Sequence, residues 1–129
     1  MVRRVEVAHA TPADLPAVRA LLLARGGEGL VGCIGLEVHG EAGLLRSFAV
    51  APAARRRGVG AVLNEAALAL ARSLGVRDLY ILTTTVRERA LRDGFVDLPR
   101  AEVPEAIREG SQFRGLCPAT AACMRMRLP

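Results

Sequence analysis

One stretch, residues 44–74, constrains the fold most, because an apolar segment is followed there by a glycine-containing turn and a long Ala/Leu segment. Residues 44–50 are apolar, aromatic and β-branched, which predicts a strand buried on both faces. Pro52 ends this strand, because proline has no N–H to donate to a sheet ladder. A helix is expected to begin near Gly60 and to end at Gly75.

The turn before this helix combines Arg55, Arg56 and Arg57 with Gly58 and Gly60. The N–H groups of a helix's first turn have no partner within the helix, and the helix dipole adds about half a positive charge there. Such a turn is suited to binding phosphate. The chain has no lysine, which a P-loop requires, and no third glycine at the spacing of a dinucleotide fingerprint.

What remains, Arg55-x-x-Gly58-x-Gly60 after a strand and a proline, resembles the acetyl-CoA loop of the GNAT N-acetyltransferases. The likeness covers nearly the whole chain. Residues 10–16 resemble the first helix of that family, residues 30–37 its central strand, and residues 92–95 the turn after its fourth helix. Residues 44–47, 113–118 and 123–124 are similar to its arsenic-resistance-associated and amino-acid N-acetyltransferase branch.

The predicted elements indicate a single domain over residues 1–129, of the α/β (α+β) class, with a mixed central sheet flanked by helices. Strands are expected at residues 2–9, 30–38, 44–50, 76–83 and 119–128, with another beginning at residue 94. Residues 30–38 and 44–50 should form an antiparallel hairpin. Residues 76–83 should lie parallel to residues 44–50, because a helix connects the two. Short helices are expected at residues 85–93 and 104–109.

The segment after the first strand allows two interpretations. Leu15, Val18 and Leu22 recur at helical spacing, which favours one helix that starts after Thr11 and stops at residues 26–27. The alternative makes residues 21–25 a strand and shortens the helix. On the first interpretation the chain lacks a helix and a strand that the resembled family has before its central strand. The acceptor pocket would then be open or completed by a second copy of the chain, so a homodimer is expected.

The resemblance implies that acetyl-CoA is the co-substrate. Its pantetheine arm would pair like an additional strand with the main chain of Phe48, Ala49 and Val50, and the Val50 N–H would face the oxyanion. The pyrophosphate would be held mainly by backbone N–H groups of Arg55, Arg56, Arg57, Gly58, Val59, Gly60 and Ala61. The alternative for the three arginines is a solvated turn or a nucleic-acid contact.

Four side chains are candidates for the chemistry. Glu37 is the candidate base, with an exposed strand-end carboxylate as the alternative, and His39 could serve instead. Arg46 could bind a substrate carboxylate through two parallel hydrogen bonds, or it could simply face solvent. Tyr80 is a candidate acid, although core packing is favoured. The position at which many family members carry an acidic Tyr is Ala90.

Composition limits the remaining classes of function. The formal net charge of +5 suits an anionic ligand, but three Phe, one Tyr and no Trp count against stacking on single-stranded nucleic acid. Three cysteines and two histidines without ligand spacing predict neither a disulfide framework nor a metal site. No apolar run reaches membrane-spanning length. Residues 1–9 lack a signal peptide's apolar centre, so a cytoplasmic location is expected.

These observations together predict an acetyl-CoA-dependent N-acetyltransferase that acts on the amine of an amino acid or an analogue, by direct attack on the thioester. Two alternatives are a non-catalytic acyl-CoA-binding module and, less favoured, a basic nucleic-acid-binding domain.

Overall fold

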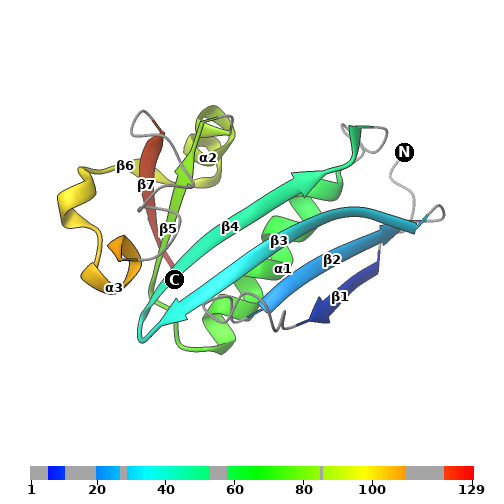
Figure 1. The fold of residues 1–129 in the computed structure, drawn as a ribbon, viewed down its shortest axis with the longest axis horizontal. Helices are drawn as coiled ribbons and strands as arrows, with labels where there is room; N and C mark the ends of the chain where they lie inside the picture. Colours follow the sequence, from blue (N-terminus) through cyan, green and yellow to red (C-terminus); the bar gives the residue numbers. More distant parts are fainter. Residues whose placement is uncertain (1–5, 11–19, 27–28, 53–57, 85, 110–120) are drawn as a thin grey trace.

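The computed structural model describes residues 6–10, 20–26, 29–52, 58–84, 86–109 and 121–129. Within them one sheet is formed in the order β1-β2-β3-β4-β5-β7-β6 (Figure 1). Its strands are β1 (Glu6–Ala10), β2 (Ala20–Gly26), β3 (Gly29–His39), β4 (Ala42–Val50), β5 (Asp78–Thr83), β6 (Val96–Asp97) and β7 (Ala122–Arg127). The helices are α1 (Val59–Ser73), α2 (Arg87–Asp93) and α3 (Glu105–Arg108), with a 3₁₀ turn, η2 (Arg100–Glu102).

The sheet is mixed, as predicted. Strands β1 to β4 pair antiparallel in chain order, β4 and β5 pair parallel, and β7 pairs antiparallel with both β5 and β6. The hairpin between β3 and β4 and the parallel connection through α1 are therefore confirmed. The strand expected from residue 94 is much reduced, because β6 contains two residues.

Strand β2 is where the structure differs from the favoured prediction. Residues 20–26 pair with both β1 and β3, so the helix expected to reach residue 26 is wrong and the alternative strand is correct. Leu22 and Ala24 are buried, while Leu23 between them is half-buried. Ala and Leu favour a helix by only about 0.7 kcal/mol per residue or less, and pairing with two strands outweighs that. The strand missing from the favoured interpretation is thus present. Residues 11–19 lie outside the described residues.

Different elements pack on the two faces of the sheet. Helix α1 packs on β2, β3 and β4 through Val59, Leu63, Ala67 and Ala71, which recur every four residues and are all buried. On the other face Leu44 and Tyr80 cluster with Val103 and Ile107, which flank and belong to α3. Strand β4 is thus buried on both faces near its beginning, as its composition predicted.

Close approach of α1 to the sheet depends on a glycine in β3. A Cβ added at Gly32 would lie 2.9 Å from the carbonyl oxygen of Ala49 and 3.0 Å from Cδ1 of Leu63. The helix that follows the predicted phosphate turn is therefore held tightly against β3 and β4. No described helix combines the length and the apolar character needed to cross a membrane.

Replacing Leu63, which is fully buried, with Ala is expected to lower the free energy of unfolding by about 2–5 kcal/mol, because a cavity is left under α1. Leu30 is 57% exposed, so Leu30→Ala should change the free energy of unfolding by about 0.5 kcal/mol or less. Urea denaturation measures both. A comparable loss in the two variants would contradict the packing of α1 on the sheet.

Candidate active site

Strand β4 loses its neighbour on one side shortly after it begins. Its parallel ladder with β5 joins Ala42, Gly43 and Leu44 to Asp78, Leu79 and Tyr80, and no pairing of the two strands is found further along in the described residues. Its antiparallel pairing with β3 continues as far as Val50. Figure 1 shows β4 and β5 diverging from this point. The segment predicted to pair with pantetheine, residues 48–50, lies beyond the last residue that pairs with β5.

A register shift in the hairpin lies beside this segment. Cys33 pairs with Ala49 and Gly35 pairs with Arg46, so β4 uses one residue more than β3 over this interval. Such a bulge bends the strand that carries the extra residue and strengthens its local twist. The bend therefore falls where β4 separates from β5.

Helix α1 begins where the sequence placed a phosphate-binding turn. Gly58 is the N-cap with φ of 79°, a left-handed conformation that favours glycine, and its carbonyl accepts the first intrahelical hydrogen bond, from the Val62 N–H. The described residues provide neither a side-chain cap nor an acidic residue in the first turn. The first-turn N–H groups and the dipole are thus available to an anion. Arg55, Arg56 and Arg57 lie outside the described residues.

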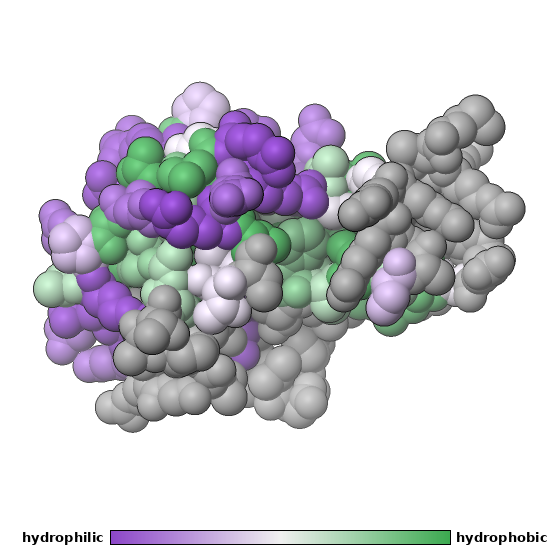
Figure 2. Space-filling view, turned by 90° about the horizontal axis from the view of Figure 1, so that it is seen from above, coloured by the Kyte–Doolittle hydropathy of each residue, from purple (hydrophilic) through white to green (hydrophobic). Residues whose placement is uncertain are grey.

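Gly60 lies where side chains from two other elements come close to the start of α1. A Cβ there would lie 2.6 Å from Nη1 of Arg89 and 3.1 Å from Cζ of Phe48. Arg89 comes from α2, and its guanidinium carbon lies 5.9 Å from the centre of the Phe48 ring. A cation from α2 therefore reaches the start of α1. The half of the molecule that carries α2 and β6 presents mostly hydrophilic residues from above (Figure 2).

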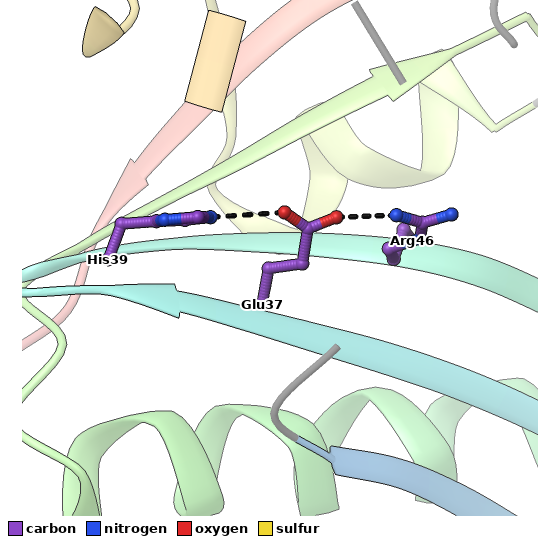
Figure 3. A network of polar contacts seen from close by, with 3 residues as sticks. All are labelled: Glu37, His39 and Arg46. Carbon is purple, nitrogen blue, oxygen red and sulfur yellow. Dashed lines mark hydrogen bonds and ion pairs between the residues drawn. The ribbon is translucent and has the colours of Figure 1, made fainter. Parts of the chain in front are cut away.

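Glu37, His39 and Arg46 come together on the face of the sheet opposite α1 (Figure 3). Oε1 of Glu37 lies 3.0 Å from Nε2 of His39, and Nη1 of Arg46 donates to Oε2 of Glu37 at 2.5 Å. The carboxylate thus has a nitrogen partner on each oxygen. We call these three residues the carboxylate cluster.

Burial decides between the alternatives for two of these side chains. Glu37 is 0% exposed and Arg46 is 7% exposed, so neither is the solvated strand residue that the sequence left open. His39 is only half-buried. A buried carboxylate stays ionised only where charge and hydrogen bonds compensate its lost hydration, and Arg46 provides both.

The structure gives no well-placed proton donor to the leaving thiol at Tyr80, the candidate acid, or at Ala90, where many members of the resembled family carry Tyr. Ala90 is buried in the core beside α1 and has no acidic group. Tyr80 is buried in the cluster around Leu44, and this burial, followed by the charge of Asp78, raises the pKa of its phenol. Core packing of Tyr80 is thus the better description.

Of the two described cysteines, one is a core residue. Cys123 is buried in β7, and burial raises the pKa of its thiol. Cys33 lies in β3 as predicted but is half-buried. Cys117 lies outside the described residues, in which no metal-binding group of three His, Cys, Asp or Glu side chains occurs.

Sequence reasoning missed Arg89 at the start of α1 and the direct contacts of His39 and Arg46 with Glu37. The first contact joins segments far apart in the chain, and nothing in the local sequence signals it. The second had a signal. Glu37 and His39 have the same parity in β3, and a hairpin with its turn at residues 40–41 brings Arg46 to the same face.

Two comparisons identify relatives by sequence and by fold. Residues 4–93 match the sequence model of the Acetyltransferase (GNAT) family. No curated protein matches the chain significantly.

Several solved structures share the fold. N-acetylglutamate synthase from Neisseria gonorrhoeae, complexed with coenzyme A and N-acetyl-glutamate, superposes with a TM-score of 0.82 at 21% identity. The alignment covers 100% of this chain but 36% of the synthase, so the chain spans little more than a third of its length. Rv2747 from Mycobacterium tuberculosis, in complex with CoA and NLQ, has a TM-score of 0.72 at 23% identity, covering 84% of this chain and 76% of that one. Tetrahymena GCN5 has a TM-score of 0.67 at 13% identity, covering 85% and 68%. At these identities the likeness shows the fold.

Replacing Arg46 with Met is expected to lower the free energy of unfolding by about 3–5 kcal/mol, because Glu37 loses the cation that compensates its burial. Arg127 pairs with Asp78 in a neighbouring strand, but its side chain is 65% exposed. Arg127→Met should therefore cost about 1 kcal/mol or less. Thermal and urea denaturation of the two variants provide the comparison, and equal losses would refute the importance of the buried pair.

Proposed function

Because the chain belongs to the acetyltransferase (GNAT) family, we propose that it transfers an acetyl group from acetyl-CoA to the amine of a small molecule. The proposed acceptor is an amino acid or an amino-acid analogue. The synthase that shares the fold was crystallised with N-acetyl-glutamate, which is an acetylated amino acid. A homodimer and a cytoplasmic location stay predictions from the sequence.

The proposal rests above all on the separation of β4 from β5. Beyond Leu44 the edge of β4 that faces β5 is not taken up by a ladder with that strand. An extended ligand with amide groups, such as pantetheine, can add to such an edge through main-chain hydrogen bonds. We therefore keep Phe48, Ala49 and Val50 as the proposed pantetheine contacts.

The start of α1 is the proposed site of the pyrophosphate. Gly58, Val59, Gly60 and Ala61 form the first turn, where the helix dipole favours negative charge. Arg89 adds a cation that comes from α2. The family resemblance also assigns Arg55, Arg56 and Arg57 to this site.

We propose that the carboxylate cluster makes the substrate amine reactive by helping to remove its proton. A protonated amine has no lone pair, so one of its N–H bonds must break before nitrogen can attack the acetyl carbonyl carbon. The bound coenzyme supplies the acetyl thioester, whose C–S bond breaks as the new C–N bond forms. We propose that removal of the amine proton depends on Glu37.

Arg46 would have two tasks. It neutralises Glu37, and we propose that it also binds a substrate carboxylate. The planar fork of N–H donors on a guanidinium matches the geometry of a carboxylate. An acceptor with a carboxylate would then be held beside Glu37.

A coenzyme-binding module without turnover is the second candidate function. It is favoured by Ala90, which leaves no acidic side chain where many members of the family carry Tyr. Direct measurement of thiol release separates the two functions. A binding module would bind coenzyme A but would release no free thiol from acetyl-CoA.

The full-length protein is expected to release free thiol from acetyl-CoA when amino acids or their analogues are added. The corresponding acids without the amine are the matched controls, since they keep the carboxylate but cannot be acetylated on nitrogen. Release with no amine in a broad panel, together with saturable coenzyme binding, would favour the binding module. Absence of both would contradict the proposal.

Gly58→Ala is expected to weaken coenzyme A binding about tenfold, which is about 1.4 kcal/mol, because the left-handed N-cap conformation at φ 79° becomes strained. Gly75→Ala is the matched control. Gly75 follows the other end of α1 with a similar positive φ of 84° and open space around it. Isothermal titration of both variants measures the difference, and equal affinities would place the coenzyme elsewhere.

A further inference from the structure

We propose that Arg89 makes this protein selective for acyl carriers that contain a pyrophosphate, because its guanidinium binds that group next to the first turn of α1. The proposal rests on the coenzyme site of the proposed function and assigns the choice between carriers to one side chain. It follows from a contact that joins the two halves of the sheet and from the chemistry of the guanidinium group.

Arg89 spans the place where two neighbouring strands separate. In the described residues, β4 pairs with β5 from Ala42 to Leu44 and not beyond. Helix α2 follows β5, and Figure 1 shows it at the end of β5 where the two strands are apart. From α2 the guanidinium carbon of Arg89 reaches to 5.9 Å from the centre of the Phe48 ring in β4. A ligand added to this part of β4 would therefore have Arg89 as a neighbour.

The same side chain lies at the first turn of α1. A Cβ on Gly60 would lie 2.6 Å from Nη1 of Arg89 and 3.3 Å from its guanidinium carbon. Gly60 is the second residue of α1, and the N–H groups of a first turn have no partner within the helix. Two kinds of hydrogen-bond donor, main-chain amides and a guanidinium, thus lie next to each other. Only the guanidinium carries a full positive charge.

The contact with Phe48 leaves the donors of Arg89 available. A guanidinium that lies over an aromatic ring uses its face, whereas its N–H donors lie in its plane and match phosphate oxygens in pairs. Phe48 can therefore hold the cation in place while the edge of the guanidinium binds an anion. Hydrogen bonds between a guanidinium and a phosphate are stronger than those between neutral groups, because both partners are charged.

The carboxylate nearest to Arg89 in its own helix compensates its charge only weakly. Nε of Arg89 lies 3.9 Å from Oδ2 of Asp93, and the two side chains are 37% and 36% exposed. An exposed pair at this spacing contributes little, because solvent screens it. The first turn of α1 has no acidic residue that would repel an anion. A pyrophosphate would thus bind between a cation and a positive helix end.

Selectivity follows from what a carrier without phosphate leaves unused. Pantetheine has the same arm and thiol as coenzyme A and would pair with β4 in the same way. It offers no anion to Arg89, so the guanidinium would contribute to the binding of coenzyme A and not to that of pantetheine. Because Arg89 is partly exposed, we expect a contribution of about tenfold in affinity, below the range for buried charged pairs.

The experiment compares wild type, Arg89→Gln and the control Arg92→Gln, which removes an exposed cation from the same helix. NMR titration of the full chain measures the affinities for coenzyme A, dephospho-coenzyme A and pantetheine. Arg89→Gln should weaken binding of the first two ligands about tenfold alike, because both contain the pyrophosphate, and should leave pantetheine binding unchanged. Arg92→Gln should bind all of them as wild type does.

Gly60→Ala provides a second variant, because its Cβ would displace the end of the Arg89 side chain without removing the cation. It should weaken coenzyme A binding in the wild-type background and have little further effect in the Arg89→Gln background. Such non-additivity is expected when two substitutions act through one contact. Equal effects of Gly60→Ala in the two backgrounds would contradict a role for Arg89 beside this glycine.

Three results would overturn the inference and leave acetyl transfer standing. The first is equal affinity of Arg89→Gln and wild type for coenzyme A. The second is an equal loss for pantetheine, because Arg89 would then act through packing on Phe48. The third is a loss for coenzyme A that dephospho-coenzyme A does not share, because Arg89 would then bind the 3′-phosphate. The expected affinities without acetylation of any amine would contradict the proposed acetyl transfer alone, and a wild type that does not bind coenzyme A would contradict both.

Discussion

The fold and the proposed chemistry both depend on the interrupted pairing of β4. The strand stays bound to β3 throughout, so its position and the placement of Arg46 opposite β3 are fixed. On its other side it follows β5 for three residues and then departs. A fully paired β4 would have used its main-chain groups within the sheet and left none for a ligand strand. Among the described residues, β4 therefore has a strand neighbour on one side only beyond Leu44.

A contribution to stability does not explain the buried ion pair of Glu37 and Arg46. Desolvation of two charges consumes most of the attraction between them, and an apolar pair of similar volume is often as stable or more stable. Nearby positions on the same face, such as Leu44 and Tyr80, are filled by packing side chains. Stability therefore does not explain why these two charges are buried here, whereas the proposed chemistry would.

The sequence was sufficient for the features that depend on local chemistry. Pro52, the glycines and the Ala/Leu run predicted the order of β4, turn and α1, and the helix connection predicted that β4 and β5 are parallel. The sequence was insufficient where the structure of a segment depends on which distant segments pair with it or contact it. Residues 20–26 have helix-forming composition, yet they form β2 because β1 and β3 offer hydrogen bonds on both edges. Arg89 reaches Phe48 across the start of α1, and no local pattern signals that contact. For Glu37 the choice of residue followed from the sequence, whereas its complete burial required the structure.

The most direct test of this account is amide hydrogen exchange of the full chain with and without saturating coenzyme A. Exchange is expected to slow at Phe48 and at the first-turn amides of α1, and to stay unchanged in β1 and β2, if a ligand strand joins β4 at the point where β5 departs. Coenzyme binding that leaves those amides exchanging at their original rates, or that protects other strands instead, would contradict it.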